Sequence, residues 1–87
     1  MEKTLKIGND DGLHARPAAA FVKEANNFKS EINIIYGDKT VNAKSIMGLM
    51  TLGLTKDAEF KVVAVGEDES EAIKKLSSLV DEKFNLH

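Results

Sequence analysis

Two β-rich runs joined by a tight turn stand in the middle of this chain, and they constrain its fold more than any other feature. The segment EINIIYGDKTVNA, residues 31–43, is interrupted by Gly37-Asp38, and this pattern predicts a β-hairpin. A hairpin makes its two strands antiparallel neighbours. We therefore expect an antiparallel sheet with helices packed on one face, which is an α+β two-layer sandwich.

The segments before the hairpin predict a strand and a helix. KTLKIGN alternates polar and apolar residues, with Leu5 and Ile7 on one face, as a strand does. Gly12 then suits a turn that other residues resist. From Pro17 to about Phe28 apolar residues recur at helical spacing, and a proline is well tolerated in the first turn of a helix.

The segments after the hairpin predict a short helix, a strand and a final helix. IMGLMTL is opened by Ser45 and closed by Gly53, and EFKVVAVG is the most strand-like run of the chain. Asp68 and Glu71 are spaced as in a capping box, which predicts a helix start. That helix has an apolar stripe formed by Ile73, Leu76, Leu79, Val80 and Phe84. The element order leaves the strand pairing open, because a ferredoxin-like arrangement uses nearly the same order.

Composition excludes several classes of function. The 87 residues suit a single domain, 1–87, and the absence of cysteine excludes disulfides and thiolate metal sites. A net charge of -2 with interspersed signs does not suit nucleic-acid binding. No apolar run approaches the roughly 20 residues of a membrane span, and the N-terminus MEKTLKIG lacks a signal-peptide core. We therefore expect a soluble cytoplasmic domain.

Three rare side chains lie within GLHARPAAAF, residues 12–21. His14 is one of two histidines, Arg16 is the only arginine and Pro17 is the only proline. The ordinary interpretation of His14 is a loop residue or a helix cap. A metal site is disfavoured because no second ligand follows at helical spacing, and no Ser-His-Asp triad can be recognised around a single internal histidine.

The position of His14 favours a role in phosphoryl transfer. The first turn of a helix exposes unpaired N–H groups and the positive end of the helix dipole, which together attract anions. The same positive end favours the neutral, nucleophilic imidazole over the charged form. Arg16 offers a planar fork of donors that suits phosphate oxygens. Because no Gly-rich nucleotide loop is present, a docked partner is the expected phosphoryl donor.

A second candidate region is NAKSIMGLM, residues 42–50. Ser45 suits an ordinary N-cap. At 100° per residue the apolar residues behind it divide between two opposite sides of the helix. If Leu49 and Leu52 face the core, the other side is an exposed docking patch, formed by Ile46, Met47 and Met50. The alternative is a helix that is buried all round.

These residues resemble the HPr family, the histidine-containing phosphocarriers of the phosphoenolpyruvate-dependent sugar phosphotransferase system. GLHARPA is similar to the phosphohistidine motif of the family and KSIMGLMTLG to its regulatory-serine motif, and AVGEDESEA also fits. The resemblance covers essentially the whole chain. It implies an open-faced β-sandwich in which a four-stranded antiparallel sheet carries three helices on one face, in the order βαββαβα.

The resemblance also implies roles for individual residues. His14 would accept a phosphoryl group on Nδ1 from enzyme I and pass it to enzyme IIA domains of sugar permeases, and Arg16 would stabilise that group. Ser45 would be modified by an HPr kinase/phosphorylase, and the phosphoserine form would act as corepressor of a catabolite-control regulator. The protein would be a monomeric carrier with a covalent phosphohistidine intermediate, not an enzyme, without metal or cofactor and without nucleic-acid or membrane partners.

The serine motif resembles the Gram-positive branch of the family, but some positions depart from the pattern of that branch. Ala19 and Lys23 stand where many members have Thr and Gln, and both should lie near the docking face. Ala43 replaces a larger aliphatic residue. A histidine-lacking regulatory relative exists, and the presence of His14 argues against that identity. Two other functions stay open: a non-catalytic, corepressor-type interaction domain with His14 as a cap, and a small-molecule-binding α+β domain.

Overall fold

The strands and helices follow one another in the predicted order. The structure is a computed structural model, and it describes residues 1–10 and 12–84. Its elements are β1 (Glu2–Lys6), α1 (Ala15–Ala25), β2 (Glu31–Tyr36), β3 (Lys39–Asn42), α2 (Ile46–Thr51), β4 (Glu59–Val65) and α3 (Glu69–Asp81). None of the helices in the described part of the chain is long and apolar enough to cross a membrane.

The strands form one sheet in the order β1-β4-β2-β3, and every neighbouring pair is antiparallel. The hairpin forms as predicted: Tyr36 pairs with Lys39, and Gly37 adopts a φ of 64° in the turn between them. β4 inserts between β1 and β2, so Phe60 faces Leu5 across one strand pair. This order answers the question of pairing that the sequence left open and confirms the predicted α+β open-faced sandwich.

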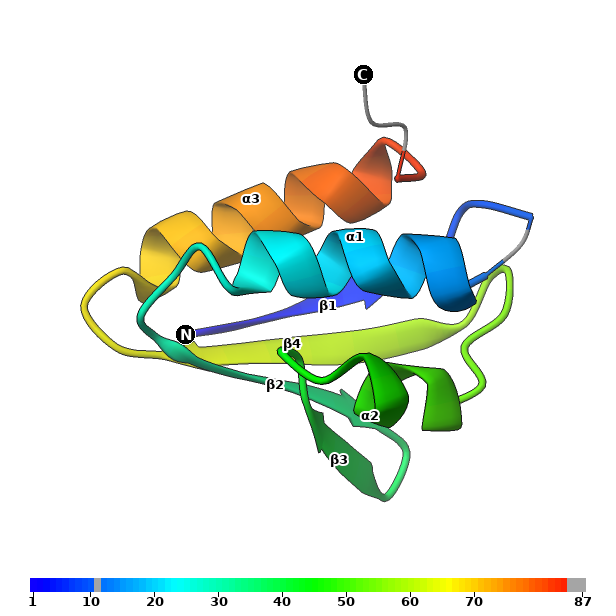
Figure 1. The fold of residues 1–87 in the computed structure, drawn as a ribbon, viewed down its shortest axis with the longest axis horizontal. Coiled ribbons are helices and arrows are strands. Elements are labelled where there is room, and N and C mark those ends of the chain that lie inside the picture. Colours follow the sequence, from blue (N-terminus) through cyan, green and yellow to red (C-terminus); the bar gives the residue numbers. More distant parts are fainter. Residues whose placement is uncertain (11, 85–87) are drawn as a thin grey trace.

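The helices form the second layer of the sandwich, with α1 and α3 lying next to each other (Figure 1). Alternate strand residues are fully buried on the face that the helices cover, as Ile32 and Ile34 show for β2. Their neighbours Glu31, Asn33 and Ile35 are exposed or half-buried. This alternation with a period of two is expected for a sheet that is covered on one side only.

Two helix ends differ from the prediction. α1 ends at Ala25, before the predicted end at Phe28, and α3 ends at Asp81, before Phe84. Both phenylalanines nevertheless pack against the core. An aromatic side chain can reach the core from the turn that follows a helix. The spacing of apolar residues therefore predicts an end for each helix that lies too late in the sequence.

The predicted capping box at the start of α3 is wrong. Asp68 occupies the N-cap position, but its carboxylate makes no cap hydrogen bond. It accepts hydrogen bonds from the backbone N–H of Lys29 at 2.9 Å and of Ser30 at 3.0 Å, and also from the Ser30 hydroxyl. These bonds, that of the Ser30 hydroxyl foremost, hold the pKa of the Asp68 carboxyl below its ordinary value of 3.8. The carboxylate thus joins the loops that precede β2 and α3.

Candidate functional site

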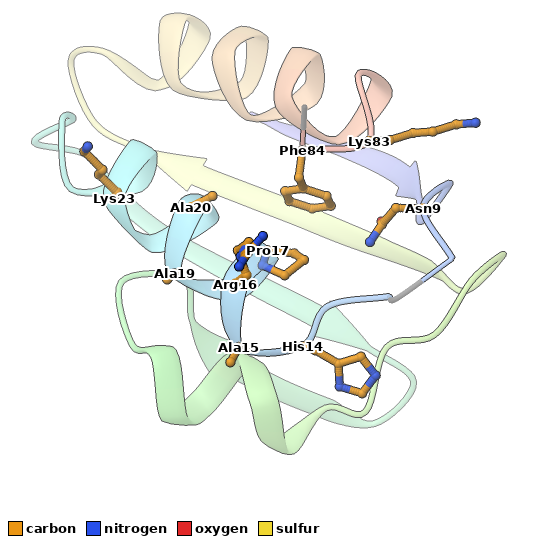
Figure 2. Close-up of a pocket in the computed structure, with 10 residues that line it drawn as sticks. All are labelled: Asn9, His14, Ala15, Arg16, Pro17, Ala19, Ala20, Lys23, Lys83 and Phe84. Carbon is orange, nitrogen blue, oxygen red and sulfur yellow. The ribbon is translucent and has the colours of Figure 1, made fainter. Parts of the chain in front are cut away.

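A hollow lies beside the first turn of α1, between the loop before that helix and the turn after α3 (Figure 2). Its lining near the first turn is formed by Asn9, His14, Arg16, Pro17, Lys83 and Phe84. Further along α1 the lining residues are Ala15, Ala19, Ala20 and Lys23. The structure therefore brings together four of the predicted site residues, namely His14, Arg16, Ala19 and Lys23.

The loop that carries His14 is held by backbone contacts to a second loop. The N–H of Leu13 donates a hydrogen bond to the carbonyl oxygen of Leu54 at 2.9 Å. Gly12 has a φ of 65°, and a Cβ at this position would overlap the Leu54 oxygen. Asn9 adds a bond from its side-chain amide to the carbonyl oxygen of Gly12 at 2.7 Å. His14 thus follows residues that are held by these contacts, and Gly12 takes the turn conformation predicted for it.

His14 occupies the N-cap position of α1, but its side chain is not used as a cap. Its carbonyl oxygen accepts the first helical hydrogen bond from the N–H of Ala18 at 2.8 Å, whereas the imidazole makes no cap hydrogen bond. The residue is exposed, and the ring has no hydrogen-bond partner among residues 1–10 and 12–84. Both ring nitrogens are therefore available for chemistry.

The first turn of α1 has the properties of an anion site. The N–H groups of Ala15 and Arg16 lie where no carbonyl of the same helix can accept them, and Pro17 has no N–H. No acidic residue lies in this turn. An anion held at this helix start would meet these donors and the positive end of an 11-residue helix.

Arg16 is exposed and forms no ion pair with the described residues. Its side chain and the His14 ring leave the first turn of α1 in different directions (Figure 2). The guanidinium must therefore turn about its flexible stem to approach a group on His14. An exposed arginine with no fixed partner can make that movement at little cost.

Ser45 and the apolar residues behind it form a separate region on α2. The Ser45 hydroxyl accepts a hydrogen bond from the N–H of Gly48 at 3.1 Å, so the predicted N-cap is confirmed. Leu49 and Leu52 are buried, at 0% and 4% exposure. The opposite side is exposed at Ile46, Met47 and Met50, by 41%, 74% and 43% respectively. The predicted division of this helix into a core side and an exposed patch is therefore confirmed, and burial all round is wrong.

Sequence patterns did not identify Asn9, Lys83 and Phe84 as lining residues. The apolar stripe assigns Phe84 to the last helix, and no sequence pattern identifies Lys83. Both reach the hollow only because α3 ends early and the chain turns back toward α1. Within the described ranges 1–10 and 12–84, no group of three or more His, Cys, Asp or Glu residues is arranged to hold a metal ion.

This open-faced sandwich presents an imidazole at a helix N-terminus, with no hydrogen-bond partner in the described part of the chain, and a guanidinium two residues on. Such an arrangement is that expected of a histidine phosphocarrier. Comparison with protein families agrees with this class. The family model described as "PTS HPr component phosphorylation site" matches residues 1–82. The chain therefore belongs to the HPr family of phosphocarriers of the phosphotransferase system.

Relatives of this chain match it over nearly their whole length. The phosphocarrier protein HPr of Buchnera aphidicola subsp. Schizaphis graminum (strain Sg) is 53% identical over 82 residues, which cover 94% of this chain and 96% of the relative. The HPr-like protein Crh of Bacillus subtilis (strain 168) is 46% identical over 83 residues, or 95% of this chain and 98% of Crh. Both types of relative therefore align with nearly the whole of this chain.

Solved structures give the same family. The crystal structure of HPr-C-His from Thermoanaerobacter tengcongensis superposes with a TM-score of 0.95 at 49% identity, over 100% of this chain and 98% of that one. A crystal structure of an HPr dimer from the same organism matches with a TM-score of 0.77 at 49% identity, over 99% of each chain. Because a dimeric relative exists, a monomeric state of this chain stays a prediction.

Proposed function

We propose that this protein accepts a phosphoryl group on Nδ1 of His14 from enzyme I and passes it to enzyme IIA domains for sugar uptake. The observation that carries this proposal is the His14 imidazole itself, which is exposed at the N-terminus of α1 without a hydrogen-bond partner among the described residues. A structural cap would use its side chain to bond a backbone N–H. An imidazole that is not used as a cap and lies at an anion site is suited to act as a nucleophile.

The transfer step uses groups that the chain already presents. The Nδ1 lone pair forms a bond to phosphorus as the bond between phosphorus and the donor breaks, and the donor keeps that electron pair. The first-turn N–H groups of α1 face the developing negative charge, and Arg16 turns to pair with the phosphoryl oxygens. The hollow is open to solvent, so a docked donor or acceptor protein can complete the site.

The test is to incubate the protein with phosphoenolpyruvate and enzyme I and to look for an acid-labile adduct on His14. The variant His14→Ala should lose the adduct completely and keep its fold, because the exposed ring has no packing role. Circular dichroism and thermal unfolding of the variant control for folding. An adduct that persists in His14→Ala would contradict the assignment.

We also assign a regulatory role to Ser45. A kinase of the HPr kinase/phosphorylase type would phosphorylate its hydroxyl, and a catabolite-control regulator would bind the modified form. The half-buried Ser45 lies next to the exposed patch of Ile46, Met47 and Met50. A phosphate there would change the charge of the surface on which partners dock. From its membership of the HPr family we also propose that the protein is a cytoplasmic, monomeric carrier.

A second candidate is a non-catalytic regulatory domain, for which the exposed patch on α2 and the 46% identity to the HPr-like protein Crh argue. In that case His14 would not be phosphorylated, and Ser45 would be the only modified residue. The enzyme I assay separates the two functions, because only the carrier acquires an acid-labile adduct on His14.

A further inference from the structure

The turn after α3 places Lys83 in a backbone conformation that a lysine does not favour. Lys83 and Phe84 have φ values of 58° and 59°. The N–H of Phe84 bonds the carbonyl oxygen of Leu79, and the N–H of Lys83 bonds that of Val80, each at 2.9 Å. These two bonds form a Schellman motif, in which glycine is the usual residue at the position of Lys83. The backbone conformation favours glycine at this position, so it does not explain why the residue is a lysine.

The Lys83 side chain is directed by its surroundings. Its Cγ and Cε lie 3.6 Å from the point that a Cβ on Gly8 would occupy, so the stem rests against the loop before α1. From there the side chain extends outward near Asn9, away from the His14 ring (Figure 2). The ammonium is exposed and forms no ion pair with residues 1–10 or 12–84. It lies at the rim of the hollow and points away from the His14 ring (Figure 2).

The charged side chains that line the hollow are all basic. Arg16, Lys23 and Lys83 line it, and no acidic residue does so among the described residues. The chain as a whole carries a net charge of -2, so this cationic area is a local feature. Clustered charges of one sign around a docking site favour a partner surface of the opposite sign and speed its association.

We propose that Lys83 is a partner-recognition residue, whose ammonium pairs with a carboxylate on the acidic surface of the protein that delivers the phosphoryl group. The inference rests on the proposed carrier function. Non-glycine residues in left-handed conformations are concentrated at functional sites, where a side chain is needed at a set position. Lys83 acts on docking and not on the transferring group, because it stands at the rim on the side away from His14.

The experiment measures enzyme I-dependent phosphorylation of the wild type and of four variants. For each protein it gives kcat and the KM of enzyme I for that protein. Lys83→Gln should raise the KM roughly 2- to 5-fold at low ionic strength and leave kcat unchanged, because only a rim ion pair is lost. Lys83→Arg should keep the wild-type KM. Lys83→Gly should raise the KM equally and also raise the thermal midpoint by roughly 2–6 °C, because glycine suits the left-handed position. Lys75→Gln, at an exposed position of α3 outside the hollow, should match the wild type.

The KM difference between Lys83→Gln and the wild type should shrink as the salt concentration rises from about 0.05 M to about 0.5 M, since salt screens exposed ion pairs. An unchanged KM in Lys83→Gln at low salt would overturn the inference. So would an equal rise in Lys75→Gln, or a fall in kcat with constant KM, which would place Lys83 on the phosphoryl group. If the wild type takes no phosphoryl group at all, the proposed function fails first, and this inference fails with it.

Discussion

The backbone N–H of Leu13 donates a hydrogen bond to the carbonyl oxygen of Leu54 at 2.9 Å, which joins the loop before α1 to the loop before β4. This contact lies directly before His14. The two backbones approach closely only because Gly12 has no side chain and takes a positive φ. The presentation of His14 therefore depends on a glycine that takes no part in the chemistry.

Replacing Gly12 by alanine should lower the free energy of unfolding by roughly 2–4 kcal/mol, because the new methyl group meets the Leu54 carbonyl in a strained backbone conformation. Gly53→Ala is the matched control. Gly53 has a similar φ of 64°, and nothing lies within 4 Å of its added Cβ, so about 1 kcal/mol is expected. Urea unfolding measures both. Equal losses would mean that the contact between the loops does not limit stability.

Arg16→Ala should slow phosphoryl transfer by roughly 10- to 100-fold while the unfolding free energy stays within about 0.5 kcal/mol of the wild type. The reason is that the exposed guanidinium has no ion-pair partner in the described structure. Arg16→Lys should restore only part of the rate, because a point charge does not reproduce the planar fork. Rapid-quench measurement of the His14 adduct tests this, and a wild-type rate in Arg16→Ala would remove the proposed role.

Ser45→Ala should cost about 1 kcal/mol of stability, because the N–H of Gly48 loses its 3.1 Å acceptor. Ser45→Asp should be close to the wild type in stability, since aspartate is also a good N-cap and its charge suits a helix N-terminus. Thermal unfolding compares the two variants. If Ser45→Asp is less stable than Ser45→Ala, a negative charge at this position destabilises the fold.

Phosphorylation of Ser45 should change partner choice. The phosphate adds about -1.5 to -2 charges beside the exposed patch of Ile46, Met47 and Met50. An acidic partner such as the proposed phosphoryl donor is then repelled, and a regulator that presents arginines is attracted. The measurement is the affinity for enzyme I and for the regulator, with and without the phosphate. Equal affinities in both forms would leave Ser45 as a cap only.

The stability that Asp68 contributes should depend on pH. Its pKa is lowered in the folded state from 3.8, chiefly by the hydrogen bond from the Ser30 hydroxyl, so its contribution is present above 3.8. It should be lost as the pH falls through the lower folded-state value. Asp68→Asn should therefore have a lower thermal midpoint than the wild type at pH 7, and the two curves should converge in acid.

The control for Asp68 is Glu67→Gln, which removes a neighbouring carboxylate that bonds no described residue. This variant should follow the wild type at pH 7. A constant difference between Asp68→Asn and the wild type at every pH would show that the ionised carboxylate is not the source of the stability.

The sequence by itself determined the features that depend on neighbouring residues. Strand alternation and the Gly37-Asp38 turn predicted the hairpin, and helical spacing separated the buried Leu49 from the exposed Met47. These predictions succeed because a side chain's face follows from the local backbone period, two in a strand and 3.6 in a helix. The motif around His14 likewise lies within a few residues of one helix start.

Only the tertiary structure decided which distant residues meet. Asp68 leaves its expected cap to bond Ser30, which lies 38 positions earlier, and Lys83 reaches the hollow of His14 from the other end of the chain. Local spacing carries no information about such pairs. The first forms because the sheet order β1-β4-β2-β3 pairs β2 with β4, and the second because α1 and α3 pack together. The end of α3 also depends on tertiary packing, because the aromatic ring of Phe84 packs on the core from a turn whose backbone is no longer helical.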